Sequence, residues 1–252
     1  RDLHYPLRRQ RQMCIRDSIN SLFLYEGKAK KVFKYGDDEV MIYFKDDATA
    51  GNRAKEAKFE GKGELNADIS GRLFGVLHEH QIDTHFIGLN GTREHRCHKL
   101  DIIPIEVIVR NKAAGTFCKR YGLEVGADLK ITIVEFCVKD DELNDPPICE
   151  DAIVSLNITD TVTLSHIKLT SLKINEILQN TFKKCGLQLI DFKLEFGLDK
   201  EGKLLLADEI CPDTMRLWND KNESFDKDLF RNDSGDLLAG YRKVQELLIN
   251  TL

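Results

Sequence analysis

The chain has 252 residues, of which 42% are hydrophobic and 31% are charged, enough for one sizeable core or two smaller lobes. Its net charge of -5 argues against a general nucleic-acid binder, which is normally basic. No apolar run reaches the roughly 18 residues that a membrane span requires. The seven cysteines are scattered without a C-x-x-C pair, which favours reduced thiols in a cytoplasmic protein over a disulfide framework or a structural zinc site.

The first segment, residues 1–20, differs from the rest of the chain. It is rich in arginine, shows little apolar periodicity and contains no apolar stretch typical of a signal peptide. We expect a tail outside the fold, either disordered or upstream of the natural start. A basic targeting arm is the alternative.

The N-terminal half then alternates strands with one helix. Two strands joined by a short turn place Lys28 and Lys30 on one strand face. A helix is expected from Glu64 to Gln81, because apolar residues recur there at helical spacing. The apolar strand Ile102–Val109 contains Pro104, which indicates an edge, a bulge or a junction between lobes.

The C-terminal half mixes strands with longer helices. A small-residue loop near Gly115 precedes a short helix, a strand and an acidic loop. A long amphipathic helix follows and ends at Gly186, a typical C-terminal cap. Its expected core positions are Ile167, Leu169, Ile174, Ile177, Leu178 and Phe182. The last helix is expected around residues 235–252.

Residues 189–210, LIDFKLEFGLDKEGKLLLADEI, predict a β-hairpin. If Glu201 and Gly202 form a two-residue loop, Glu195 lies opposite Asp208. Two like charges about 5 Å apart repel by roughly 3 kcal/mol at an effective dielectric near 20. A proton, a lysine such as Lys193 or a divalent cation would offset this repulsion. The alternative is a solvated face whose side chains splay apart.

Other charged groups suggest phosphate chemistry. Lys28 and Lys30 could place two cations over a polyphosphate, and Arg110 could bind a second phosphate together with Thr116 and the amides around Gly115. The chain has neither a Walker loop nor a G-x-G-x-x-G loop. Lysines for nucleotide phosphates and carboxylates for Mg²⁺ on separate strands suit another design. Each group taken alone also fits an ordinary solvated surface.

Taken together, the motifs identify a family. Between about residues 24 and 248 the chain resembles phosphoribosylaminoimidazole-succinocarboxamide synthases (SAICAR synthetases). The resemblance rests on the order of YEGKAKKVF, FKDDATAGN, GKGELNADIS, IIPIEVIVRNKAAGTFCKRYG, KDDELNDP, NEIL, DFKLEFG, LADEICPDTMRLW and FDKDLFR. It implies an α+β, two-lobed, ATP-grasp-like fold with antiparallel sheets and ATP in the cleft. The sheet-rich nucleotide-binding lobe would span residues 21–103, and the mixed lobe with the metal and substrate site would span residues 104–252.

The resemblance also implies a reaction. An ATP-dependent ligase joins L-aspartate to carboxyaminoimidazole ribonucleotide through an acyl phosphate, giving SAICAR, ADP and phosphate. Mg²⁺ and a homo-oligomer are further implications, with small molecules as the partners and neither nucleic acid nor membrane among them. The implied roles are ATP binding by Lys28, Ala29, Lys30 and Lys139, metal binding by Glu195 and Asp208, substrate binding by Arg110, Thr116, Asp213 and Arg216, and catalysis by Asp191 and Lys193.

Three positions depart from the usual family pattern. Thr116 stands where serine is usual and keeps the hydroxyl, whereas Cys211 replaces a serine with a weakly hydrogen-bonding thiol. Arg53 stands where glycine is usual, in a loop that would strain a side chain if it needs a positive φ.

Two rival functions remain open at this stage. One is a nucleotide-binding regulator that keeps the fold without ligating, and the other is a kinase of related fold that phosphorylates a hydroxyl. The presence of Lys28, Glu195, Asp208 and Arg216 argues against loss of activity. ADP release that requires both the ribotide and aspartate would exclude both rivals.

Overall fold

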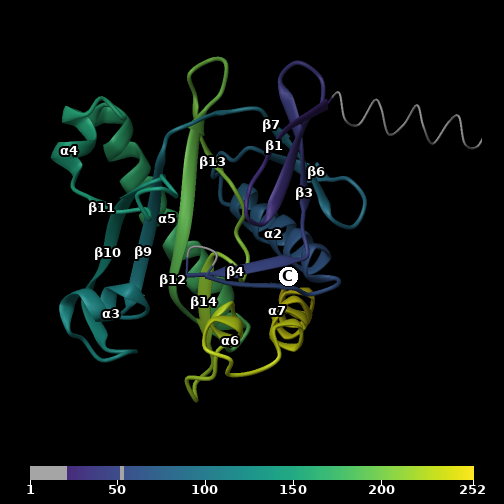
Figure 1. Ribbon diagram of the computed structural model, residues 1–252, viewed down its shortest axis with the longest axis vertical. Coiled ribbons are helices and arrows are strands. Elements are labelled where there is room, and N and C mark those ends of the chain that lie inside the picture. The colour runs from purple at the N-terminus through teal and green to yellow at the C-terminus, as the bar shows by residue number, and fades with distance from the viewer. Residues whose placement is uncertain (1–21, 52–53) are drawn as a thin grey trace, which may run out of the picture.

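The computed structural model describes residues 22–51 and 54–252, and it shows a mixed α+β fold whose named strands all pair antiparallel (Figure 1). The expected class and antiparallel sheets are therefore confirmed. The tail at residues 1–20 and the substitution at Arg53 lie outside the described residues.

The N-terminal part forms a five-stranded sheet. Its order is β1 (Phe23–Glu26), β2 (Lys30–Lys34), β3 (Glu39–Phe44), β7 (Glu94–His98) and β6 (Phe86–Leu89). A separate two-stranded sheet consists of β4 (Asp47–Ala50) and β5 (Lys55–Lys58). The turn between β2 and β3 spans the predicted residues 35–38. The first predicted strand is divided into β1 and β2, so Lys28 lies in the connection between them and not on a strand face shared with Lys30.

The C-terminal part is built around a seven-stranded sheet. Its main path is β11 (Pro147–Ile148), β10 (Asp128–Val138), β9 (Ile105–Lys112), β12 (Gln188–Leu198) and β13 (Leu204–Ala207). The long strand β12 also pairs with β8 (Asp101–Ile102) and β14 (Met215–Trp218). Pro104 lies between β8 and β9, which agrees with its expected place at a break in the strand.

Six helices of four or more residues accompany the sheets in the described part of the chain. They are α2 (Lys62–Glu79), α3 (Thr116–Tyr121), α4 (Glu150–Ser155), α5 (Thr161–Lys184), α6 (Asp228–Arg231) and α7 (Leu237–Thr251). Helix α2 contacts β3, β6 and β7 of the first sheet and also the helices α5 and α7. Helix α5 covers β9 and β12. No helix in the described ranges is long and apolar enough to cross a membrane.

The largest hydrophobic core crosses the boundary expected near residue 103. It combines Leu73 and Leu77 of α2 with Ile177 of α5 and with Val107 and Phe192 of the second sheet. Burial of this apolar surface fixes α2 between the two sheets.

The long helix α5 confirms most of the expected core but corrects one position. Leu169 is 67% exposed, whereas the other five expected core residues are buried. Leu169 follows the buried Ile167 by two residues, which is about 200° around a helix, so it projects from the opposite side. The predicted end is confirmed, because Gly186 has φ +71° and its N–H donates to the carbonyl of Lys183.

The register of the β12–β13 hairpin differs from the prediction by one residue. Glu195 lies opposite Ala207 rather than Asp208. The carboxylate of Asp199 accepts hydrogen bonds from the N–H groups of Glu201 (3.0 Å) and Lys203 (2.8 Å), which makes the loop longer than two residues. Asp208 then follows the end of the strand in a left-handed conformation, with φ +61°.

Candidate active site

Two adjoining cavities mark the candidate site. The first, the apolar-walled cavity, has a volume of about 360 Å³. Val32 on β2 and Val40 and Ile42 on β3 form part of its wall. Its charged lining consists mainly of Lys28, Lys30, Lys139, Lys193, Glu195, Asp208 and Glu209. An apolar wall beside clustered lysines suits a planar base that carries phosphates.

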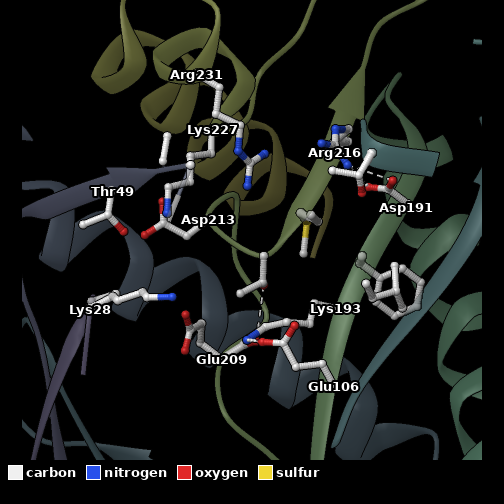
Figure 2. A pocket seen from close by; sticks show the side chains of 18 of the residues that line it. Lys28, Thr49, Glu106, Asp191, Lys193, Glu209, Asp213, Arg216, Lys227 and Arg231 are labelled. Atoms are coloured by element: carbon white, nitrogen blue, oxygen red, sulfur yellow. Dashed lines mark hydrogen bonds and ion pairs between the residues drawn. The ribbon is translucent and has the colours of Figure 1, made fainter. Parts of the chain in front are cut away.

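The second cavity, the arginine-lined cavity, has a volume of about 350 Å³ (Figure 2). Its cationic lining includes Arg110, Arg216, Lys227 and Arg231. Lys28, Ala29, Glu106, Lys193 and Glu209 line both cavities. The cavities are therefore two ends of one cleft, joined at these shared residues.

A lysine lies between the two acids that the hairpin was expected to pair. The Nζ of Lys193 is 2.7 Å from Oε1 of Glu195 and 3.5 Å from Oδ2 of Asp208. Lys139 forms a second close ion pair with Glu195, which is only 2% exposed. The acids thus come together in spite of the shifted register, and lysines offset their repulsion.

Glu195 and Asp208 have opposite pKa shifts. Burial alone would raise the pKa of Glu195, but the charges of Lys193 and Lys139 outweigh burial and hold it well below its usual range. Burial raises the pKa of Asp208, and burial also lowers the pKa of its close partner Lys30. Glu195 is therefore a firmly ionised carboxylate, and the charges of Asp208 and Lys30 depend on each other.

The backbone around Asp208 is held by a buried histidine. Nε2 of His85 lies 2.9 Å from the carbonyl oxygen of Asp208. Burial and the nearby charge of Lys30 lower the pKa of His85 to about 3, so the imidazole is neutral and donates its Nε2–H to that carbonyl. This hydrogen bond supports the left-handed turn that aims Asp208 and Glu209 into the cleft. The sequence offered no signal for this role of His85.

At the other end of the cleft, Asp191 lies between two arginines. Its carboxylate accepts hydrogen bonds from Arg110 Nη1 (2.9 Å) and Arg216 Nη1 (2.8 Å). Arg110 also donates to Glu135 at 2.8 Å, and Arg216 donates to Asp228 at 2.7 Å. Both guanidinium groups are therefore fixed in direction before a ligand arrives, and Arg110 already directs its Nε and Nη2 donors to Glu135.

Gly115 allows Arg216 to approach the loop before α3. Gly115 has φ +59°, and a Cβ added there would lie about 2.5 Å from Nη2 of Arg216. A side chain at this position would collide with the guanidinium and strain the backbone. Thr116 follows as the first residue of α3 and lines the same cavity. The small-residue loop thus accommodates the Arg216 side chain, whereas the sequence predicted that it would approach a phosphate.

A buried polar group surrounds Asp213. Tyr241 OH donates to its Oδ1 at 2.6 Å, Asn66 Nδ2 donates to its Oδ2 at 2.9 Å, and Lys62 forms a close ion pair with Oδ2. Oδ1 of Asn66 is the single buried side-chain nitrogen or oxygen without a hydrogen-bond partner in the described part of the chain. An unsatisfied buried acceptor costs about 1–3 kcal/mol, so this group is arranged around Asp213 at some expense of stability.

All twelve predicted site residues line one cavity or both. The apolar-walled cavity contains the predicted ATP and metal residues, and the arginine-lined cavity contains the predicted substrate residues together with Asp191 and Lys193. Four other charged lining residues had no role predicted from the sequence: Glu106, Glu209, Lys227 and Arg231. The FDKDLFR motif contained the signal for Lys227 and Arg231, and LADEI contained the signal for Glu209.

Lysines around acids at one end of the cleft and oriented arginines at the other define an enzyme that binds a phosphorylated nucleotide beside a second anionic substrate. A family model described as SAICAR synthetase matches residues 23–248. The phosphoribosylaminoimidazole-succinocarboxamide synthase of Methanocaldococcus jannaschii is 50% identical over 226 residues, which cover 89% of this chain and 93% of that protein. The chain belongs to the SAICAR synthetase family.

Solved structures agree with this assignment. A SAICAR synthetase (type-2) in complex with ADP has a TM-score of 0.87 and 48% identity, covering 89% of this chain and 96% of its own. The phosphoribosylaminoimidazole-succinocarboxamide synthase of Ehrlichia chaffeensis has a TM-score of 0.88 and 46% identity, covering 91% and 99%. The Saccharomyces cerevisiae enzyme, at 19% identity and a TM-score of 0.72, shares the fold.

Proposed function

We propose that the two cavities divide the substrates of one ligase reaction between them. Family membership makes the chain an ATP-dependent ligase that joins L-aspartate to carboxyaminoimidazole ribonucleotide in purine biosynthesis. In our proposal ATP occupies the apolar-walled cavity, with its base against Val32, Val40 and Ile42. The ribotide and aspartate occupy the arginine-lined cavity. The single observation that carries this assignment is the set of residues that line both cavities, where the γ-phosphate would meet the carboxylate it activates.

The chemistry requires activation because a carboxylate is a poor electrophile. The γ-phosphoryl group of ATP moves to a carboxylate oxygen of the ribotide, giving an acyl phosphate and ADP. The amine of aspartate then attacks the carbonyl carbon, loses a proton and expels phosphate. Alignment of the three substrates in one cleft supplies much of the rate, since it replaces encounters in solution by fixed neighbours.

The lysines of the shared region neutralise the charge that gathers during phosphoryl transfer. Lys28 reaches both cavities, and Lys30 and Lys193 flank Asp208. Burial alone would lower the pKa of Lys193, but the charges of Glu195 and Glu106 outweigh burial and raise it. Lys193 therefore stays protonated and stabilises developing negative charge rather than serving as a base. This gives a charge-stabilising role to Lys193, one of the two residues for which the family resemblance implies catalysis.

In the arginine-lined cavity, Arg110, Arg216 and Thr116 hold the ribotide phosphate in our proposal. Asp191 acts through the two arginines, because it fixes the direction of both guanidinium groups. Lys227 and Arg231 line the same cavity and offer cations for the carboxylates of aspartate.

The carboxylates suit a magnesium ion that arrives with the nucleotide. No group of three or more His, Cys, Asp or Glu side chains is arranged as a metal centre within residues 22–51 and 54–252. Mg²⁺ in nucleotide enzymes commonly takes only one or two carboxylates and completes its shell with phosphates and water. Glu195 and Asp208 fit that requirement, with Lys193 as the cation between them. When bound, Mg²⁺ would neutralise phosphate charge.

We further propose that the fold is the two-lobed, ATP-grasp-like arrangement with the cleft between residues 21–103 and 104–252. The cleft lining supports this division, since β2 and β3 face β12 and the turn after β13 across the nucleotide end. The two lobes would share the hydrophobic core that includes α2. A homo-oligomer remains an expectation from the family.

The decisive experiment measures ADP release with each substrate omitted in turn. We expect ADP release at the full rate only when both the ribotide and aspartate are present, and we expect a product with the mass of SAICAR. ADP formation with a hydroxyl acceptor would support the kinase, and ATP binding without any turnover would support the regulator. Glu195→Gln should lose activity. Glu201→Gln in the exposed turn of the same hairpin is the matched control and should keep it.

A further inference from the structure

Asp213 accepts hydrogen bonds from side chains that do not line the cleft. Lys62 is the first residue of α2, Asn66 lies one turn further along that helix, and Tyr241 belongs to α7. Lys62 and Tyr241 are 0% exposed and Asn66 is 2% exposed, and none of the three lines either cavity. They can therefore influence a ligand only indirectly, and the cavity-lining side chain that all three contact is Asp213.

The hydrogen bonds leave Asp213 with one open acceptor position. A carboxylate offers about four lone-pair sites, two on each oxygen. Oδ2 accepts from Lys62 and from Asn66, so both of its sites are filled. Oδ1 accepts only from Tyr241 in the described part of the chain, at 2.6 Å. One site on Oδ1 remains for a donor that enters the cavity.

The neighbours of Asp213 direct their donors to its carboxylate even where this leaves a polar atom of their own unpaired. Asn66 turns its Nδ2 toward the carboxylate and leaves its own Oδ1 without a partner. Rotating that amide by half a turn would aim an oxygen at the carboxylate instead. Lys62 additionally donates to the carbonyl of Asp47 at 3.0 Å. Asp47 is the first residue of β4, and Thr49 and Ala50 of that strand line the arginine-lined cavity. The ammonium group of Lys62 therefore links Asp213 to the strand that forms another wall of this cavity.

We propose that Lys62, Asn66 and Tyr241 are positioning residues that hold the carboxylate of Asp213 in one orientation. In that orientation its Oδ1 accepts one hydrogen bond from an N–H or O–H group of a substrate in the arginine-lined cavity. The proposal rests on the proposed function, and the donor is a hydroxyl of the ribotide or the amine of aspartate. Burial alone would raise the pKa of Asp213, but the charges of Lys62 and Lys227 outweigh burial and hold it well below its usual range. Asp213 therefore accepts hydrogen bonds and gives up no proton near neutral pH.

The test begins with Tyr241→Phe, which keeps the buried ring and removes only the hydroxyl. Loss of one donor lets the carboxylate rotate, so the KM for either the ribotide or aspartate should rise about tenfold while the KM for ATP stays unchanged. The substrate whose KM rises is the source of the donor. The control is Val244→Ala on the same helix, a fully buried residue of the largest hydrophobic core whose side chain has no hydrogen-bonding group. It should lower the melting temperature and leave all three KM values unchanged.

A double-mutant cycle shows whether Tyr241 acts through Asp213. Asp213→Asn alone should raise the same KM, and Tyr241→Phe combined with Asp213→Asn should lose no more than Asp213→Asn alone. Additive losses would overturn the proposal, as would unchanged KM values in Tyr241→Phe. Asn66→Ala provides the same test from α2 if Tyr241→Phe fails to fold. Failure of the proposed function is a separate outcome, because it would show as absent ligase turnover in the unaltered protein.

Discussion

Glu195→Gln should destabilise the ligand-free protein far more than Asp208→Asn does. Both substitutions keep the shape and remove one carboxylate from the same cluster. Breaking a buried ion pair by removing one partner costs about 3–5 kcal/mol. In Glu195→Gln, Lys193 still has two carboxylate partners, Glu106 at 2.9 Å and Asp208 at 3.5 Å. We therefore expect the unfolding free energy to fall by about 3 kcal/mol, the lower end of that range. For a chain of this size that corresponds to a fall in melting temperature of about 6–12 °C.

Asp208→Asn should change the unfolding free energy by less than about 1 kcal/mol, or raise it, because burial already disfavours the charge of Asp208. Lys30 retains Glu209 as a close partner in this variant. The assay is thermal unfolding of both variants at pH 7 without nucleotide or Mg²⁺, with the exposed Glu201→Gln as control. Losses that agree to within about 2 °C would refute the asymmetry.

The pH dependence gives a second check on Glu195. Its folded pKa lies below the unfolded value of about 4.3, so its stabilisation is present above that value and is lost as the pH falls through the folded pKa. The stability difference between the unaltered protein and Glu195→Gln should therefore hold between pH 7 and 5 and shrink below about pH 4. A difference that grows on acidification would show that the lysines do not hold the carboxylate ionised.

Three other predictions concern ligands. Arg110→Ala and Arg216→Ala should each raise the KM for the ribotide by about 10- to 100-fold, since each removes a charge-assisted contact. An equal rise in the KM for ATP in the same assays would show that these arginines bind the nucleotide. Asp208→Asn should lower turnover by about a hundredfold or more and raise the Mg²⁺ concentration that gives half-maximal rate. Adding Glu195→Gln to this variant should lower turnover little further. An unchanged Mg²⁺ titration would show that the two acids do not bind the metal. Gly115→Ala should raise the KM for the ribotide and lower the melting temperature by a few degrees, because its Cβ meets Arg216; normal ribotide kinetics would show that Arg216 is not positioned by this loop.

Local patterns predicted much of the fold. The alternation of apolar and charged residues predicted the β12–β13 hairpin, and helical spacing predicted α2 to within two residues at each end. The cap at Gly186 followed from its permissive backbone. The hairpin register did not follow, because it depends on how the carboxylate of Asp199 bonds within the turn. A slip of one residue there moved Ala207 into the place expected for Asp208.

The sequence by itself predicted, through its family motifs, twelve residues that line the cleft, but it did not predict Glu106, Glu209, Lys227 or Arg231. Phosphate and carboxylate chemistry requires lysine, arginine and acidic side chains, and the motifs contain them. Tertiary structure alone decided which of them are partners. Lys30 meets Asp208 across 178 residues, and Lys62 meets Asp213 across 151. Lys62 lies within the GKGELNADIS motif and Tyr241 lies outside the motifs, and neither was assigned a role, since both look like ordinary helix residues until the fold brings a carboxylate to them. Periodicity reports the face of one element, whereas such a contact is set by the packing of several elements around a shared core.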